Sequence, residues 1–342
     1  MRQGENVLVF ENKPSVICWS SVVGKKEAEG PLAAGFDLII DDIMAGQDSW
    51  ELAESYFQRT SIGILLKKSG IKPENADVLF AGDLLNQCSG TGYGIRDFNI
   101  PFSGVYGACS TSVLSIINAA IGVNSGIFKT AIASTSSHFC SAEKQFRQPL
   151  EYGGQRTPTS QWTVTGASAS LIAENSNSSF PKIEKAIIGK IVDKGVSDPN
   201  NMGAAMAPAA AQTIADFLND TKTSPTDYDL ILTGDLGKVG SKLLYELLEN
   251  EFKINIRDIH NDAGMMIYYL DEQDVHSGGS GCACCGAVLC SKIFNDLHSG
   301  KLNKVLVVAT GALLSSISTL QGETIPSIAH GILLTGGDVK NE

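Results

Sequence analysis

Apolar residues in this chain occur in two kinds of run, and the two kinds alternate. Residues 78–81 and 230–232 are short apolar runs that lead into Gly-Asp-Leu, which is typical of a strand followed by a turn. Residues 113–121 read VLSIINAAI, a longer apolar segment that favours a buried helix. Because the short runs are continuously apolar, we expect strands covered on both faces. The pattern predicts an α/β protein with mostly parallel sheets.

The same order of elements occurs twice along the chain. In the first half, the Gly-Asp-Leu run is followed by a Gly-Ala-Cys turn, the apolar helix and an expected strand at residues 129–134. In the second half, it is followed by a glycine-rich turn at residues 277–281, an apolar segment at residues 282–297 and an expected strand at residues 304–309. A duplicated strand–helix–strand unit explains this order.

The seam between the halves is expected near residues 174–179, which read ENSNSS and have the composition of a loop. The predicted halves are residues 1–175, which carry Cys109, and residues 176–342. A helix at residues 208–218 belongs to the second half, with Pro208 in its first turn, where proline is tolerated.

Length and charge narrow the class of protein. A chain of 342 residues with 43% hydrophobic residues exceeds the size at which one core usually stops growing, which agrees with two packed halves. The net charge of −11 argues against general binding to nucleic acid or to an anionic membrane surface. No apolar window is long enough to span a membrane, and the first residues show no signal peptide. With eight cysteines and no export signal, we expect a soluble, intracellular chain.

Cys109 is the candidate reactive residue of the first half. It follows a Gly-Ala turn and stands at the head of the apolar helix, in the string VYGACSTS of residues 105–112. Free amide groups and the positive end of the helix dipole favour a thiolate at this position. The same features also form a binding site for the carboxylate of a ligand. The residues leave open whether Cys109 attacks a substrate or helps to hold an anion.

Three strings of the chain resemble the thiolase-like superfamily, which includes thiolases and ketoacyl synthases. They are the GACS turn at residues 107–110, the TGASA segment at residues 165–169 and the glycine-rich turn at residues 278–281. The resemblance covers nearly the whole chain. It implies a thiolase-like five-layer α-β-α-β-α fold with two pseudo-repeated halves, and a homodimer.

More narrowly, the chain resembles the stage V sporulation protein AD family of spore-forming bacteria. The strings that carry this resemblance are CWS at 18–20, MGAAMAP at 202–208, HNDAG at 260–264, GGSGCACC at 278–285 and IPSIAHG at 325–331. The resemblance implies binding of dipicolinic acid (pyridine-2,6-dicarboxylate), free or as its calcium chelate, and a role in its uptake into the forespore. It also implies other stage V sporulation A membrane proteins as partners, which would hold the chain peripherally at the spore inner membrane.

The condensation reaction of the superfamily needs partner groups that this chain lacks at their usual places. Members carry a histidine in the loop after the second-half strand, where this chain has Asp235. They carry asparagine or histidine in the later glycine-rich turn, where this chain has Gly279. Near the C-terminus, Ala-His-Gly replaces a glycine-rich string and brings His330. We therefore predict a protein without catalytic activity, in which Cys109 is a relic nucleophile.

Dipicolinate is a flat dianion, and its pocket needs hydrogen-bond donors, cations and an apolar slot. The helix start at Cys109 and Ser110 is expected to receive one carboxylate. Ser137 and His138 end the next strand and should open on the same pocket, because strand ends line ligand crevices in α/β folds. Asp83, at the end of a neighbouring strand, is expected to orient His138 or to cap the helix that follows it.

Positive charge for the pocket has four candidates between residues 90 and 158. They are Arg96, Lys144, Arg147 and Arg156, and arginine is better suited than lysine to forked bonds with carboxylates. Arg147 and Arg156 are taken as the site candidates, although the residues do not decide which of the four faces inward. His330 could enter the pocket from its own loop, whereas His276 is expected to be a loop histidine.

No metal or cofactor is predicted. The cysteines at residues 282, 284, 285 and 290 lack the paired spacing of zinc or iron–sulfur ligands, and a tightly packed buried helix explains them better. Two other hypotheses stay open. One is an active Cys-dependent acyltransferase or condensing enzyme that uses Cys109 with His138 or His330. The other is a structural dimer without a ligand.

Overall fold

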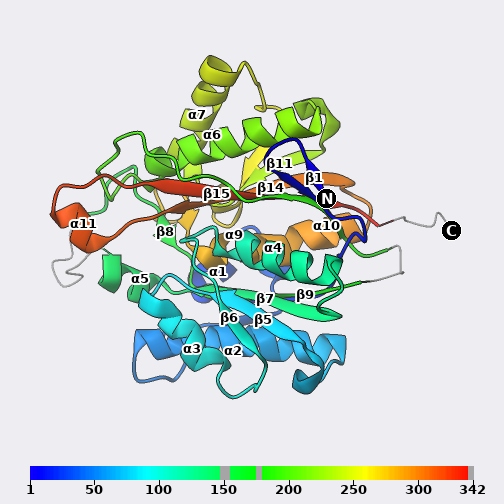
Figure 1. Ribbon diagram of the computed structural model, residues 1–342. Helices are drawn as coiled ribbons and strands as arrows, with labels where there is room; N and C mark the ends of the chain where they lie inside the picture. Colours follow the sequence, from blue (N-terminus) through cyan, green and yellow to red (C-terminus); the bar gives the residue numbers. More distant parts are fainter. Residues whose placement is uncertain (147–154, 175–178, 338–342) are drawn as a thin grey trace.

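The computed structural model describes residues 1–146, 155–174 and 179–337. In this described part of the chain, the main strands form one 13-stranded sheet, and its two halves alternate with three layers of helices (Figure 1). The outer layers hold α2 (Trp50–Ser69) and α3 (Ser89–Ile95) on one side and α6 (Met202–Thr221) and α7 (Gly237–Leu247) on the other. The layer between the two halves of the sheet holds α4 (Thr111–Asn124), α9 (Cys282–Val288) and α10 (Phe294–His298).

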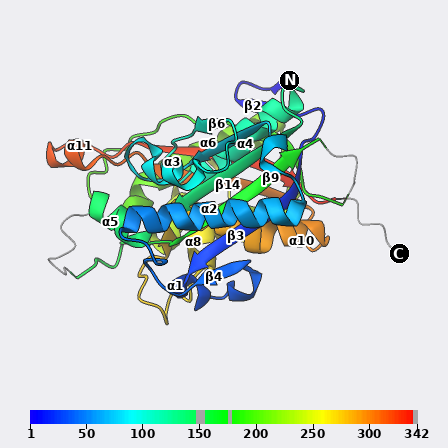
Figure 2. The same ribbon diagram turned by 90° about the horizontal axis from the view of Figure 1, so that it is seen from below.

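α2 and α3 cover the outer face of the first-half sheet and lie in front of its strands when the molecule is seen from below (Figure 2). Its strand order is β6-β5-β7-β9-β3. β5 pairs in parallel with β6 and β7, whereas β9 pairs antiparallel with β7 and β3. The strands are β3 (Ser15–Gly24), β5 (Val78–Gly82), β6 (Phe102–Gly104), β7 (Thr130–Ser137) and β9 (Gly166–Ala173).

The second-half sheet has the order β12-β11-β14-β15-β10 and repeats this arrangement. β11 pairs in parallel with β12 and β14, whereas β15 pairs antiparallel with β14 and β10. The strands are β10 (Lys182–Ile187), β11 (Leu230–Thr233), β12 (His260–Asp262), β14 (Lys304–Ala312) and β15 (Ser327–Thr335). The two halves of the sheet meet where Lys182 of β10 pairs with Ser15 of β3.

The two strand orders correspond position by position, so the predicted duplication is confirmed in the fold. Both Gly-Asp-Leu strings follow the central parallel strand of their sheet, β5 in one half and β11 in the other. The predicted boundary between residues 175 and 176 stays a prediction, because residues 175–178 lie outside the described part of the chain.

Short elements complete the fold. α5 and α11 lie at the same end of the molecule, away from the two termini, in both views (Figures 1 and 2). These elements are β1 (Arg2–Gln3), β2 (Val7–Val9), α1 (Lys25–Ala28), β4 (Leu38–Ile40), α5 (Phe139–Phe146), β8 (Trp162–Thr163), α8 (Ala263–Met266), β13 (Gly279–Ser280) and α11 (Ser316–Leu320).

One predicted boundary is wrong. The helix expected to begin at Pro208 is α6, which begins at Met202 and has Pro208 in its interior. The side chain of Asn201 accepts a hydrogen bond from the amide of Ala204 at 3.3 Å and caps the helix there. A capping asparagine outside the apolar run therefore decides where α6 starts.

Candidate functional site

The turn that carries Cys109 is held by its own hydroxyl groups. Thr111 Oγ1 donates to the carbonyl of Ala108 at 2.7 Å and accepts from the amide of Gly107 at 3.0 Å. Ser110 Oγ donates to the carbonyl of Gly107 at 2.6 Å. Ala108 has a φ of 50°, a conformation that non-glycine residues rarely adopt and that clusters at functional sites. The turn thus fixes the position of Cys109 at the start of α4.

The amide groups of this turn are less available than the sequence predicted. The amides of Ser110 and Thr111 donate to the carbonyls of Gly107 and Ala108, both at 3.1 Å. Ser110, which was predicted to help receive a ligand carboxylate, uses both its amide and its hydroxyl within the turn and is not among the residues that line the pocket described below.

The environment of Cys109 favours the neutral thiol. The residue is 6% exposed, and its Sγ lies 3.8 Å from Ser280 Oγ, which donates to Asp235 Oδ2 at 2.9 Å. Burial and the charge of Asp235 raise the pKa of the Cys109 thiol well above its ordinary value. The expectation of a thiolate is wrong, because desolvation and a nearby carboxylate outweigh the helix dipole.

Asp235 belongs to the floor of this site and does not cap the following helix. Its Oδ2 accepts from Ser280 Oγ and from the amide of Gly281, and its Oδ1 accepts from Thr310 Oγ1 at 2.7 Å. The capping role is taken by Asp262, which accepts from the amide groups at the start of α7 at 2.8 and 2.9 Å.

Asp83 is the counterpart of Asp235 in the first half, and it is fully buried. It accepts from the amide of Leu85 at 2.7 Å and from the amide and hydroxyl of Thr91 at 2.6 Å each. Its neighbour Glu54 accepts from two serine hydroxyls, and burial together with the charge of Asp83 raises the pKa of Glu54 to about 8. Asp83 thus supports the α3 turn and makes no contact with His138 among those that the structure shows.

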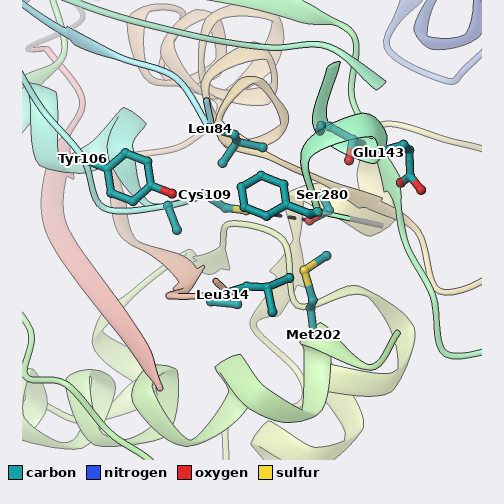
Figure 3. Close-up of a pocket in the computed structure, with 12 residues that line it drawn as sticks. Leu84, Tyr106, Cys109, Glu143, Met202, Ser280 and Leu314 are labelled. Carbon is teal, nitrogen blue, oxygen red and sulfur yellow. Dashed lines mark hydrogen bonds between the residues drawn. The ribbon is translucent and has the colours of Figure 1, made fainter. Parts of the chain in front are cut away.

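A pocket opens directly above Cys109 (Figure 3). Its empty space is about 440 Å³ with the solvent at its mouth included, but the centre of a water molecule can reach only about 30 Å³ of it. Figure 3 shows Tyr106, Leu314, Met202 and Glu143 arranged around the Cys109–Ser280 contact. The walls are apolar with a few hydroxyls: Leu84, Tyr106, Ala108, Cys109, Ala142, Glu143, Phe146, Thr163, Met202, Ser280, Ala312 and Leu314.

None of the five histidines of the chain, all within the described residues, lines this pocket. His138 Nε2 lies 2.8 Å from the carbonyl of Ile43, and its Nδ1 accepts from the amide of Cys140. His330 is 3% exposed and sits behind the turn, where its Nδ1 accepts from the amide of Gly189 at 3.2 Å. Burial lowers the pKa of His330 to about 4 and also lowers that of His138, so both rings are neutral near pH 7. Neither ring reaches Cys109.

The remaining histidines are engaged elsewhere in the described structure. His260 bonds to Thr233 and Tyr245, His298 bonds to the carbonyl of Ser179, and His276 pairs with Asp274 at 3.4 Å. Ser137, which was expected at the pocket, donates to the carbonyl of Val164 and packs inside the sheet.

Among the described basic candidates, Arg156 contacts a residue of the pocket wall but does not line the pocket itself. Its guanidinium is 3.5 Å from Glu143, which lines the pocket, and it also donates to the carbonyl of Gln161. Lys144 is bound to Glu51 at 2.6 Å, and Arg96 is exposed beside Asp97. Arg147 lies outside the described residues.

The four second-half cysteines are buried along one helical segment formed by α9 and the π-helix that follows it. Three of their thiols point to different backbone carbonyls, those of Ala108, Gly234 and Ala169. Within the described residues, no group of three or more histidine, cysteine or acidic side chains is placed to hold a metal ion. No described helix is long and apolar enough to cross a membrane.

Two comparisons of sequence agree. A family model described as Stage V sporulation protein AD matches residues 4–335. The stage V sporulation protein AD of Bacillus subtilis (strain 168) is 45% identical over 331 residues, which cover 96% of this chain and 96% of that protein. The chain belongs to the stage V sporulation protein AD family. The narrower resemblance drawn from the sequence is confirmed.

Solved structures similar to this family member are condensing enzymes of the thiolase-like fold. An OleA variant from Xanthomonas campestris aligns with a TM-score of 0.60 at 12% identity and covers 96% of this chain and all of its own. The 3-oxoacyl-[acyl-carrier-protein] synthase III of Aquifex aeolicus aligns with a TM-score of 0.56 at 10% identity and covers 94% of this chain and 99% of its own. At these identities the likeness concerns the fold, and it confirms the predicted thiolase-like architecture.

Sequence reasoning missed several pocket residues of this family member, although signals for some of them were present. Tyr106 directly precedes the Gly-Ala-Cys turn, and Ser280 lies inside the glycine-rich turn that pairs with it in the repeat. Thr163, Met202 and Glu143 reach the pocket from three separate segments. No local sequence pattern predicts that these three residues line the pocket, because only the packing of the two halves brings them together.

Proposed function

We propose that this member of the stage V sporulation protein AD family binds dipicolinic acid in the Cys109 pocket without catalysing a condensation. The observation that carries the proposal is a pocket beside a neutral, buried thiol that no histidine lines, among residues that the structure describes. Condensation through a thiol needs an activated thiolate and a partner acid or base. Binding of a flat ligand needs neither.

The walls of the pocket suit a flat aromatic acid. Leu84, Phe146 and Leu314 offer apolar contact for a ring, since ligand sites are mostly apolar with a few directing polar groups. The hydroxyl of Thr163 lines the same space and can donate to a carboxylate oxygen, whereas the single proton of the Ser280 hydroxyl is already donated to Asp235. The centre of a water molecule can reach only about 30 Å³ of the pocket. Side chains at the mouth must therefore move outward to admit the pyridine ring of dipicolinate.

Charge recognition is assigned to Arg156. Its guanidinium is 3.5 Å from Glu143, and both side chains are largely buried at 17% and 8% exposure. A ligand carboxylate can replace the Glu143 carboxylate on the guanidinium, because both present the same planar pair of oxygens. The free acid and the calcium chelate both carry such a carboxylate.

The biological role follows from the family and not from the pocket. We propose that the chain acts in uptake of dipicolinic acid into the forespore, as a homodimer held at the spore inner membrane by other stage V sporulation A membrane proteins. The absence of a membrane-spanning helix among the described residues fits an attachment through partners.

Calorimetric titration with dipicolinate tests the proposal. We expect one saturable site per chain, lost in Leu314→Trp, which fills the pocket from its wall. Ile317→Trp is the matched control, because Ile317 is 70% exposed on α11 outside the pocket and should bind as the wild type does. Arg156→Lys should weaken binding by about tenfold, as expected for a lost forked hydrogen bond.

The competing hypothesis is an active acyltransferase, and its specific support is the fold shared with condensing enzymes. Incubation with an acyl-CoA followed by intact-protein mass spectrometry separates the two. Our proposal expects no stoichiometric acylation of Cys109. An acyl adduct on Cys109 together with an absent dipicolinate heat would replace our proposal by this one.

A further inference from the structure

A second cleft lies beside α1 and shares no lining residue with the Cys109 pocket. Its empty space is about 800 Å³ with open solvent included, and the centre of a water molecule reaches about 380 Å³ of it. The cleft is therefore roomier than the Cys109 pocket. Its lining consists of Gly24, Lys25, Lys26, Glu27, Glu29, Asp41, Ile43, Phe139, Trp162 and Thr165.

Two stacked aromatic rings stand between this cleft and the Cys109 pocket. The rings of Phe139 and Trp162 lie 3.7 Å apart between centroids, with their planes 7° from parallel. Phe139 begins α5, which supplies Ala142 to the wall of the Cys109 pocket, and Trp162 directly precedes Thr163 of that pocket. A molecule in the cleft can therefore contact these rings without entering the Cys109 pocket.

Glu27 is the unusual group of the cleft, because it is 1% exposed and half of its carboxyl has no partner. Its Oε1 accepts from the amide of Thr165 at 3.0 Å and from the Tyr268 hydroxyl. Its Oε2 is buried without a hydrogen bond, and a Cβ at position 24 would stand 2.9 Å from it. Gly24 and Glu27 both line the cleft, so Oε2 lies just behind the cleft wall, and a ligand reaches it when the neighbouring side chains shift.

A buried carboxyl oxygen without a partner is costly and is a reason to look for a ligand that satisfies it. Burial raises the pKa of the Glu27 carboxyl, and a cation placed at Oε2 would oppose this shift. The rim carries Glu29 and Asp41 together with Lys25 and Lys26, so its charges balance and the attraction for a cation rests on Glu27.

The cleft already holds one ammonium group of the chain itself. Lys26 Nζ lies 4.2 Å from the centroid of the Trp162 ring, within the distance at which a cation is attracted to an aromatic face. An ammonium is thus accommodated in the same cleft as Glu27, next to the ring wall.

From these observations we propose that the cleft binds an organic ammonium ion, whose nitrogen donates to Glu27 Oε2 and whose carbon chain lies along Ile43 and the Phe139–Trp162 rings. The inference does not rest on dipicolinate binding. The two cavities share no lining residue, although the Arg156 guanidinium lies 5.5 and 5.1 Å from the centroids of the Phe139 and Trp162 rings.

Calorimetric titration with 1,4-diaminobutane tests the proposal, with 1,4-butanediol as the uncharged control and potassium chloride matched in both solutions. We expect saturable binding of the diamine and none of the diol. Glu27→Gln should weaken diamine binding by about ten- to a hundredfold, as expected for a charge-assisted hydrogen bond. Glu29→Gln changes an exposed rim carboxylate and should leave the affinity within about threefold, as expected for a solvated charge pair.

Gly24→Ala is the second variant, because its Cβ would stand 2.9 Å from Oε2 and take the space that the ammonium group needs, without changing any charge. The backbone at Gly24 has φ −81° and ψ 178°, which alanine adopts freely, so the added methyl group acts by its volume. It should abolish diamine binding while dipicolinate binding persists. Thermal unfolding of each variant verifies that it is folded.

Three results would overturn the proposal. The first is that the wild type shows no saturable binding of the diamine. The second is that folded Glu27→Gln or Gly24→Ala binds the diamine as tightly as the wild type does. The third is that Glu29→Gln loses as much affinity for the diamine as Glu27→Gln does. The last result would mean that the rim carboxylates attract amines without a site. If only dipicolinate fails to bind, the proposal for the amine cleft stands, and the result counts against the proposed function instead.

Discussion

Replacing Asp235 with asparagine should make Cys109 more reactive. The carboxylate of Asp235 is one of the two main causes that raise the pKa of the Cys109 thiol, after burial itself. Asparagine keeps the size and can still accept from Ser280 Oγ or from the amide of Gly281. The change therefore removes a charge from the site and keeps most of its contacts.

The size of the effect follows from the geometry. The contacts of Ser280, 3.8 Å to Cys109 Sγ and 2.9 Å to Asp235 Oδ2, place the two charges within about 7 Å of each other. At an effective dielectric constant of about 20, their repulsion is about 2 kcal/mol, which corresponds to roughly 1.5 pKa units. The thiolate fraction then rises about 30-fold at neutral pH. A thiolate of lower pKa is also a weaker nucleophile, so the net acceleration of alkylation is about sevenfold.

The assay is alkylation by iodoacetamide, followed for each cysteine peptide by mass spectrometry. Cys140 is the internal control, because its pKa is raised to about 11 by burial and by Glu143, and Asp235 is not among the causes. We expect faster labelling of Cys109 in Asp235→Asn and an unchanged rate at Cys140. An unchanged or slower rate at Cys109 in a folded variant would refute the claim that Asp235 holds this thiol neutral.

Two further predictions concern stability. Glu54 keeps its proton up to about pH 8 in the folded chain, against an ordinary value of 4.5, so the folded state binds more protons between these values and the free energy of unfolding falls as pH rises across them. Urea unfolding should therefore show a smaller loss of stability from pH 5 to pH 9 in Glu54→Gln than in the wild type, and equal losses would contradict this account. Gly82→Ala should destabilise the fold by more than about 3 kcal/mol, because its Cβ would stand 1.9 Å from the carbonyl oxygen of Val105. Gly92→Ala is its control in α3, where a Cβ meets nothing within 4 Å, and it should be neutral or stabilising; similar melting temperatures for the two variants would refute the packing argument.

Much of the fold was predictable from the sequence because local signals repeat. The two Gly-Asp-Leu strings and the apolar segments placed the central strands and the middle helices within a few residues. The start of α6 was missed because Asn201, and not Pro208, makes the cap. A cap depends on one hydrogen bond outside the apolar run, so hydrophobic periodicity does not reveal it.

The site was less predictable because its residues meet only through tertiary packing. His138 follows β7 as expected, yet its ring turns to the carbonyl of Ile43, which lies 95 residues earlier in the chain. Asp235 and Asp262 are both acidic residues at strand ends, and only the fold decides that Asp262 caps α7 while Asp235 faces Cys109. Of the candidate site residues that the structure describes, only Cys109 lines the pocket, because the loop sequence does not fix how the other side chains are oriented.

The most direct test of the central claim is a crystal structure of the protein soaked with dipicolinate. We expect ligand density in the Cys109 pocket, with the ring between Leu314 and Phe146, a carboxylate at Arg156 or at the Thr163 hydroxyl, and an unmodified Cys109 Sγ. Dipicolinate bound elsewhere with this pocket empty, or covalent density on Cys109, would contradict it.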